Sequence, residues 1–356
     1  MTSQQPVTPQ PVTPDSTAPA DSPLLARPGA VPADGPDAGT AWHYGDPVRE
    51  QRSLADGDAL VDLSHRGVVT VAGPDRLSWL DTLSTQWLRD LPAGRSAEAM
   101  ILSPNGHIEH VLHVVDDGDR AWLTVEPGCA PALVAHLEKM RFMLRVEVAD
   151  VTADWAVVGA AGADVPGGPT WTDPWPDGGP ETTARYSTVQ THPAHGRVWT
   201  ETLVPRGDLA RTVGERPLAG SWASEALRVE AWRPRFGFET DHRTIPHELD
   251  WLRTAVHLQK GCYRGQETVA RVHNLGRPPR RLVFLHLDGS THELPARGAE
   301  ITPADGGRAV GRVTTVARHH ELGPIALAVL KRNTDPEAPL LVDGTVSAAQ
   351  EVVVAP

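Results

Sequence analysis

The chain has 356 residues, enough for two or three domains with substantial cores. Its formal net charge of −12 argues against non-specific nucleic-acid binding, including direct DNA binding, because contacts to phosphates need a basic surface. It has only two cysteines, Cys129 and Cys262, and no CxxC pair, so neither a disulfide framework nor a cysteine-rich zinc site is indicated.

The N-terminal residues do not resemble a secretory signal, since they lack a basic segment followed by an apolar one. No part of the sequence approaches the roughly 18 consecutive apolar residues of a membrane span. We therefore expect a cytoplasmic protein that does not act at a membrane. Residues 1–40 are mostly Pro, Thr, Ala, Ser and Asp, and this composition predicts a disordered tail.

Residues 41–150 show the pattern of a first α+β unit. A strand from Val68 leads into a helix that begins near Gly73-Pro74-Asp75 and carries leucines at helical spacing. Turn residues then separate further short strands, and a second amphipathic helix precedes a closing strand. The expected later elements are strands at 100–102, 108–115 and 122–125, a helix at 130–143 and a strand from 145. This alternation predicts a ferredoxin-like unit.

Residues 151–275 are expected to form a second α+β unit, with strands near 156–159 and 198–204 and helices at 221–232 and 246–260. Gly261 has the place of a glycine that ends a helix, so Cys262 is expected just beyond a helix end. From residue 276 to 356, short alternating runs separated by Gly and Pro predict a small all-β domain.

Cys262 lies among charged residues, two positions after one of only three lysines in the chain. Lys260, Arg264 and Arg271 would lower the pKa of its thiol and enlarge the fraction of thiolate, which is both a nucleophile and a soft-metal ligand. The alternative is that Cys262 is a small buried apolar residue. Its polar neighbours Gln266 and Glu267 would be costly to bury, so we favour a functional thiol. We assign Cys129 the buried role.

The run from His107 to His113 invites a metal-site interpretation. In a strand, side chains alternate between faces, so His107, Glu109 and His113 share one face and His110 lies on the other. No further ligand converges on them, and we expect no metal site. Glu109 follows the Asn105-Gly106 turn, a place from which a carboxylate can face a ligand.

Glu230 lies at the edge of the apolar stripe of the helix expected at 221–232. A half-buried carboxylate needs hydrogen-bond donors, which could be adjacent N–H groups of a ligand ring or the side chains of Arg228, Arg233 or Arg235. The residue pattern leaves both possibilities open. The sequence also has no Walker A, strand-linked GxGxxG, HExxH or GxSxG motif.

The stretch Lys260-Gly-Cys-Tyr-Arg-Gly-Gln-Glu-Thr-Val-Ala-Arg271 is similar to the signature of the YgfZ family, folate-binding relatives of the glycine-cleavage T-protein, an aminomethyltransferase. The resemblance covers about residues 45 to 356. It extends to segments that read Asp62-Leu-Ser-His65, Val71-Ala-Gly73, Ser103-Pro-Asn-Gly106, Leu227-Arg-Val-Glu230 and Pro246-His-Glu248.

This resemblance implies an α+β fold in which two ferredoxin-like units and a C-terminal antiparallel β-barrel form a three-domain ring. It also implies that tetrahydrofolate or a one-carbon derivative binds in the central hole, where the residue matching Glu230 holds the pterin edge, near Asn105 and Glu109. T-proteins carry an Asp-Asp pair after the turn that matches Asn105-Gly106. Here Glu109 and His110 stand in that place, which argues against aminomethyl transfer.

YgfZ-type proteins are implied to support iron–sulfur enzymes, including one that modifies tRNA, through folate and the motif cysteine. The resemblance therefore implies a monomeric accessory protein whose partners are folate and iron–sulfur client enzymes or assembly proteins. Cys262 would be its reactive centre, tuned by Lys260, Arg264 and Arg271, with Gln266 and Glu267 fixing the loop. Two alternatives stay open: an aminomethyltransferase acting on a lipoylated carrier protein, and a non-enzymatic folate-binding scaffold.

Overall fold

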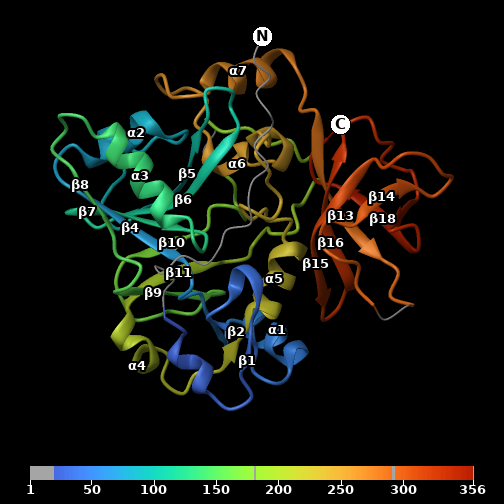
Figure 1. Cartoon of the computed structure of the whole chain (residues 1–356), viewed down its shortest axis with the longest axis horizontal. Helices are drawn as coiled ribbons and strands as arrows, with labels where there is room; N and C mark the ends of the chain where they lie inside the picture. Colours follow the sequence, from blue (N-terminus) through green and yellow to red (C-terminus); the bar gives the residue numbers. More distant parts are fainter. Residues whose placement is uncertain (1–19, 180–181, 291–292, 356) are drawn as a thin grey trace, which may run out of the picture.

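A computed structural model describes residues 20–179, 182–290 and 293–355 of the chain. Two α+β units and a β-barrel pack against one another, with the barrel at the right of Figure 1 and the two sheets at its left. The helices are η1 (Pro23–Ala26), η2 (Gly35–Asp37), α1 (Pro47–Ala55), α2 (Arg76–Leu83), α3 (Ala130–Met140), η3 (Arg206–Asp208), α4 (Leu209–Val213), α5 (Ser221–Glu230), η4 (Pro246–Leu249), α6 (Leu252–Ala255) and α7 (Gln266–Leu275).

The first unit is built on sheet I, whose strand order is β5-β6-β7-β4-β8. Its strands are β4 (Gly67–Ala72), β5 (Ser96–Leu102), β6 (Ile108–Asp116), β7 (Arg120–Val125) and β8 (Glu147–Asp150), and neighbouring strands are antiparallel. Leu80 of α2 and Leu133 of α3 are fully buried in one cluster with the sheet residue Val69. The ferredoxin-like arrangement is confirmed, with β5 as an additional edge strand.

The second unit is built on sheet II, with the strand order β10-β11-β9-β3-β12. Its strands are β3 (Leu60–Asp62), β9 (Trp155–Ala160), β10 (Thr170–Thr172), β11 (Thr200–Pro205) and β12 (Leu218–Ala219). Because β3 pairs with β9 and with β12, the segment before Gly67 joins sheet II rather than sheet I. The prediction that residues 41–150 form one unit is wrong for this segment, since strand pairing across the chain leaves no local mark in the sequence.

Part of the predicted N-terminal tail is ordered. Ser22 begins η1 and accepts a hydrogen bond from the backbone N–H of Leu24 at 3.2 Å. Leu24 is buried beside Leu60 of sheet II, and β1 (Val31–Pro32) pairs with β2 (Ala41–His43). The prediction of disorder is therefore wrong for residues 20–40, because the buried Leu24 and the ion pairs of Asp37 with Arg235 and His65 hold this mostly polar segment against the rest of the fold. Residues 1–19 lie outside the described residues.

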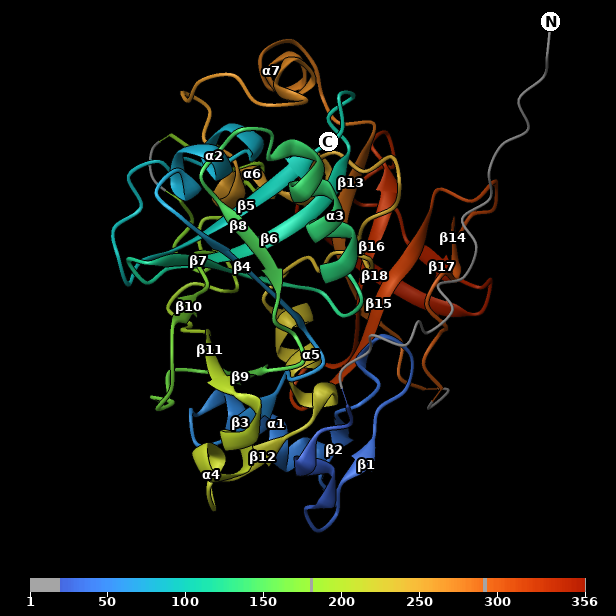
Figure 2. The ribbon, with the colours of Figure 1, turned by 60° about the vertical axis from the view of Figure 1, so that its left-hand side comes forward.

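The C-terminal unit is a closed antiparallel barrel with the strand order β13-β16-β15-β14-β17-β18. Its strands are β13 (Arg280–Leu287), β14 (Glu300–Pro303), β15 (Gly311–His319), β16 (Gly323–Lys331), β17 (Leu340–Val342) and β18 (Val346–Val352). The predicted barrel is confirmed. Figure 2 shows α5 between the barrel and sheet II, so this helix faces the middle of the molecule.

The helix predicted over residues 246–260 is wrong. Asp250 adopts a left-handed conformation with φ of 57° after η4, and α6 ends at Ala255, where Val256 turns extended. The Asp250 carboxylate accepts a hydrogen bond from the backbone N–H of Tyr186 at 2.5 Å, and this contact between residues far apart in the sequence helps to offset the backbone strain. Gly261 consequently ends no helix, and Cys262 lies in the loop that leads into α7. In the described part of the chain, no helix has the length and apolar character needed to cross a membrane.

Candidate functional site

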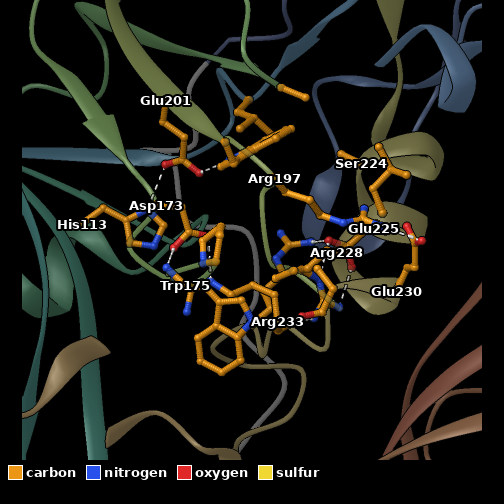
Figure 3. Close-up of a pocket in the computed structure, with 18 of the residues that line it drawn as sticks. His113, Asp173, Trp175, Arg197, Glu201, Ser224, Glu225, Arg228, Glu230 and Arg233 are labelled. Atoms are coloured by element: carbon orange, nitrogen blue, oxygen red, sulfur yellow. Dashed lines mark hydrogen bonds and ion pairs between the residues drawn. The ribbon is translucent and has the colours of Figure 1, made fainter. Parts of the chain in front are cut away.

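A cavity of about 620 Å³ lies where the three units meet (Figure 3). His113 of β6, Glu230 of α5 and His320 at the end of β15 all line it, so each unit contributes to the wall. Pockets that hold small molecules commonly measure about 300 to 1,000 Å³. The cavity is therefore large enough for a ligand with two or more rings.

Aromatic side chains form one wall of the cavity. The rings of His113 and Trp171 lie parallel, with centroids 3.7 Å apart and an angle of 2° between their planes. Trp175 lies within cation–π distance of two guanidinium groups, with the Cζ atoms of Arg233 and Arg253 at 5.0 and 4.7 Å from its ring. These contacts fix the rings in place, and Trp171 and Trp175 are almost fully buried behind the cavity surface, so they support the wall rather than offer a free face to a ligand.

Glu230 is the last residue of α5, and its carboxylate faces the cavity. One oxygen is 2.5 Å from Nη2 of Arg197 and the other is 3.1 Å from Nε2 of His319. Burial would raise the pKa of Glu230, but the contacts with His319 and Arg197 outweigh it and hold the pKa at about 2. Glu230 is thus ionised at neutral pH, and its partners are not the nearby arginines that the sequence suggested.

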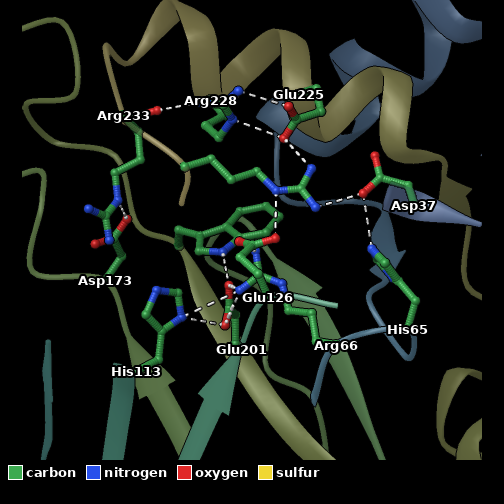
Figure 4. A network of polar contacts seen from close by, with 12 residues as sticks. Asp37, His65, Arg66, His113, Glu126, Asp173, Glu201, Glu225, Arg228 and Arg233 are labelled. Carbon is green, nitrogen blue, oxygen red and sulfur yellow. Dashed lines mark hydrogen bonds and ion pairs between the residues drawn. The ribbon is translucent and has the colours of Figure 1, made fainter. Parts of the chain in front are cut away.

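A network of ion pairs runs through the cavity wall (Figure 4). Arg235 donates to Asp37 at 2.7 Å and to Glu126 at 2.8 Å, while Arg66 donates to Glu201 at 2.8 Å. Among the residues that the structure describes, eight carboxylates and five arginines line the cavity. This balance does not favour a polyphosphate ligand and suits a neutral ring that carries N–H donors. The sequence did not identify Asp37 as a cavity residue, because it falls in the segment that was predicted to be a disordered tail.

Cys262 is exposed and lies apart from the cavity wall. Among the described residues that line the cavity, Glu230 is present, but Cys262, Asn105 and Glu109 are not. Glu109 accepts a hydrogen bond from Nη1 of Arg264 at 3.0 Å instead. The structure therefore divides the predicted site into a cavity group that contains Glu230 and a surface group that contains Cys262.

The surface group is held together by the approach of two loops. Gly106, with φ of 77°, packs against Thr268 of α7 so closely that an added Cβ would lie 2.8 Å from the Thr268 Cβ. Gln266 donates to the carbonyl of Lys260 at 3.4 Å, while Glu267 and Arg271 are exposed on α7. The turn at Asn105 and the cysteine motif thus form one surface.

Lys260 is buried, although it stands only two residues before the exposed Cys262. Its ammonium is buried and donates to the backbone carbonyls of Asp81, Ser84 and Gln86 at 2.5, 2.9 and 2.6 Å. It also lies 3.3 Å from Oδ1 of Asp81. The lysine therefore anchors the motif loop to the end of α2, and its effect on the thiol stays a prediction.

Alkylation should separate the two cysteines. Burial and the nearby Glu126 raise the pKa of Cys129 to about 11, whereas Cys262 is exposed. We expect iodoacetamide to modify Cys262 rapidly and Cys129 much more slowly at neutral pH, as followed by intact-mass spectrometry. The variant Cys262→Ser should lose the rapid phase. A rapid phase that persists in this variant would contradict the assignment.

The histidines of β6 lie on opposite faces, as the strand alternation predicts. His113 faces the cavity, whereas the His110 ring is 5.7 Å from that of His136 on α3. Burial, and then His136, lower the pKa of His110 to about 4. Within the ranges that the structure describes, no cluster of three or more His, Cys, Asp or Glu side chains is arranged to hold a metal ion.

Residues 35–165 match the family described as GCVT N-terminal domain. A chloroplastic transferase of Arabidopsis thaliana is 27% identical over 73% of this chain, which spans only 62% of that relative. An aminomethyltransferase of Rubrobacter xylanophilus is 27% identical over 80% of this chain and 79% of its own length. A mitochondrial iron–sulfur cluster assembly factor IBA57 homolog of Cryptococcus neoformans is 25% identical over 64% of this chain and 66% of its own length.

The fold is that of the solved glycine cleavage system aminomethyltransferase T from Bartonella henselae. The two superpose with a TM-score of 0.71 at 19% identity, over 92% of this chain and 94% of the other. These comparisons support the T-protein-like superfamily, and they do not distinguish the YgfZ group within it.

Proposed function

We propose that this chain binds tetrahydrofolate, or a one-carbon derivative of it, and serves as a cytoplasmic accessory factor for iron–sulfur cluster assembly or repair. Its clients would include iron–sulfur enzymes that modify tRNA. The ionised Glu230 at the wall of a ring-sized cavity is the observation that carries the folate part. The iron–sulfur part draws on the motif around Cys262 and on the similarity to an assembly factor.

The cavity suits a reduced pterin in both shape and charge. Glu230 would accept two adjacent N–H groups of the pterin edge, for which Arg197 must move aside or share the carboxylate. Arg197 can do so because about a third of its side chain is exposed, at 36%. Trp171 and Trp175, buried behind the cavity surface, would keep the wall rigid around the ring. The folate would supply a one-carbon carrier, and the protein would supply its orientation and its separation from water.

Cys262 would act at the surface, toward a partner protein. Its thiolate could accept a one-carbon unit, relay sulfur or ligate iron transiently, and all three need a sulfur that a partner can reach. Cys262 is exposed beside the Arg264–Glu109 ion pair, which gives that surface a polar rim. In this proposal the folate and the thiol therefore occupy different places on the molecule.

An aminomethyltransferase of the glycine-cleavage type is the second candidate, and the similarity to such an enzyme favours it. General acid–base catalysis requires a carboxylate within about 2.6 to 3.2 Å of the reacting atom. Glu109 instead pairs with Arg264 away from the cavity wall. An assay with a lipoylated carrier protein distinguishes the two, because the accessory-factor proposal predicts no efficient turnover. A folate-binding scaffold, the third candidate, would not need Cys262.

Replacing Glu230 by alanine should weaken tetrahydrofolate binding by about 10- to 150-fold. This is the effect of losing a charge-assisted pair worth about 1.5 to 3 kcal/mol. Calorimetric titration measures the affinity, with thermal unfolding as a check that the variant folds. The control is Glu351→Ala, which removes a carboxylate that also contacts a histidine, His286, but on the barrel surface. Equal affinity in wild type and Glu230→Ala would remove Glu230 from the site.

A further inference from the structure

A stacked pair of tryptophans lies at the surface, apart from the cavity. Trp42 of β2 and Trp222, in the first turn of α5, have ring centroids 4.7 Å apart and an angle of 22° between their planes. Trp42 is 44% exposed, and neither ring is among the described residues that line the cavity. Large apolar groups that gather at the surface mark interaction sites far more often than singly scattered ones do. The pair therefore indicates a binding surface.

The two segments that carry the pair are held together by one buried carboxylate. Glu50 of α1 accepts hydrogen bonds from the backbone N–H groups of Tyr44 and Asp46 at 2.8 and 3.2 Å through Oε1, and from Gly220 at 3.0 Å through Oε2. This carboxylate ties the end of β2 to the start of α5, which lie side by side in Figure 1.

The rings themselves are held by their own contacts. They stack on each other, and the ring centroid of His43 lies 5.4 Å from that of Trp42. The exposed part of Trp42 is thus presented from a fixed base, so a ligand would not have to order it on binding.

The sequence before the described chain has the chemistry of a ligand for such a surface. Residues 6–14 read Pro-Val-Thr-Pro-Gln-Pro-Val-Thr-Pro and contain the pattern PxxP twice. Segments of this kind favour the extended polyproline II helix, which docks on surfaces lined by aromatic side chains. Residues 1–14 carry no charged side chain, so a chain with a formal net charge of −12 does not repel them.

The described chain begins close enough to β2 for this segment to reach the pair. The backbone N–H of Ser22 donates to the carbonyl of Gly39 at 2.8 Å, and Gly39 stands three residues before Trp42, a span of at most about 11 Å. The stretch from Pro14 to Ser22 can cover about 25 Å as a polyproline II helix. A segment tethered in this way is present at an effective concentration on the order of millimolar.

We propose that the PxxP segment of residues 6–14 docks as a polyproline II helix on the Trp42–Trp222 pair of the same chain. Its prolines would pack on the exposed part of Trp42, and an indole N–H would donate to a backbone carbonyl, which this helix leaves free. The chain's own segment is favoured over one from a partner because the tether supplies it at high local concentration. This inference does not depend on the folate function, because the pair lies outside the cavity.

The test is NMR of the tryptophan indole N–H groups in the full chain, with Trp42→Phe and Trp222→Phe to assign the two signals. The four-proline variant carries Pro6→Ser, Pro9→Ser, Pro11→Ser and Pro14→Ser. We expect the Trp42 and Trp222 signals to differ between wild type and this variant. Pro19→Ser, which changes a proline outside the two PxxP patterns, is the control and should leave both signals unchanged.

A peptide of residues 1–19 gives a second measurement. Added to the four-proline variant at about 1 mM, it should return the Trp42 and Trp222 signals to their wild-type positions. Combining that variant with Trp42→Ala should abolish the response of Trp222 to the peptide. Trp87→Ala, at an exposed tryptophan that lies beside His257, should leave the response intact.

The other outcomes would overturn the proposal. Identical Trp42 signals in wild type and the four-proline variant would refute the docking, and if the peptide still shifts them, the pair takes a proline-rich segment of another protein. Shifts that vary with protein concentration over about a tenfold range would assign the site to the tail of a second copy. A shift of Trp87 in place of Trp42 would put the segment elsewhere. Equal thermal unfolding of wild type and variant confirms that only the tail has changed.

Discussion

Replacing Lys260 by methionine should lower the free energy of unfolding by about 3 kcal/mol or more, a large part of the stability of a typical domain. The methionine fills the same space but leaves the three carbonyls of residues 81, 84 and 86 without their donor. It also removes the cation beside the buried Asp81. Urea denaturation measures the change. Lys139→Met, at an exposed position of α3, is the control and should change stability by less than about 0.5 kcal/mol.

The same variant tests what Lys260 does for Cys262. Because the ammonium is buried against the end of α2, we expect the alkylation rate of Cys262 to be the same in Lys260→Met as in wild type wherever the variant is folded. A severalfold slower alkylation with unchanged stability would show the reverse, namely that the lysine activates the thiol and does not anchor the loop.

Replacing Cys262 by serine should abolish the function in cells and leave folate binding intact. A hydroxyl is a far weaker nucleophile than a thiolate and a poor ligand for soft metals, whereas the exposed position makes the exchange harmless to the fold. We expect a strain lacking its own family member to regain iron–sulfur enzyme activity with wild type but not with Cys262→Ser. Tetrahydrofolate affinity should stay within about twofold, because Cys262 lies apart from the cavity wall.

Cys129→Ala serves as the control for this experiment, since Cys129 packs partly buried against the core of sheet I. It should support growth and enzyme activity like wild type. If Cys262→Ser also supports full activity, the scaffold alternative is correct. If Cys262→Ser binds folate much more weakly, then the thiol belongs to the cavity after all and the separation of the two groups is wrong.

The sequence predicts the fold wherever the pattern is local. The strand over 108–115, the barrel strands and the helix α2 are predicted because apolar residues gather between glycine, proline and other turn residues, and most of those residues are buried in the structure. The prediction of one helix over 246–260 fails because the backbone turns at Asp250, whose carboxylate is held by the backbone N–H of Tyr186. The prediction of disorder around Leu24 fails for a similar reason, since this segment packs against sheet II. In both cases the deciding partner lies far away in the sequence.

Contacts between residues far apart in the sequence also limit how well the candidate site can be predicted. The helical position of Glu230 predicts a half-buried carboxylate without deciding between a ligand and an arginine as its partner, and the structure places it at the cavity wall. Its partners, Arg197 and His319, come from a loop and from the barrel, and no spacing in the sequence points to them. The twelve-residue motif identifies Cys262 and Lys260 as neighbours but gives no direction for their side chains. The structure shows that Cys262 is exposed and that the Lys260 side chain is buried.

A crystal structure of the protein with tetrahydrofolate tests the central claim most directly. We predict the pterin ring inside the cavity, with its N–H edge on Glu230. Cys262 should remain exposed and out of contact with the ligand. A folate bound beside Cys262 and Arg264 on the surface, with no ligand at Glu230, would contradict the account.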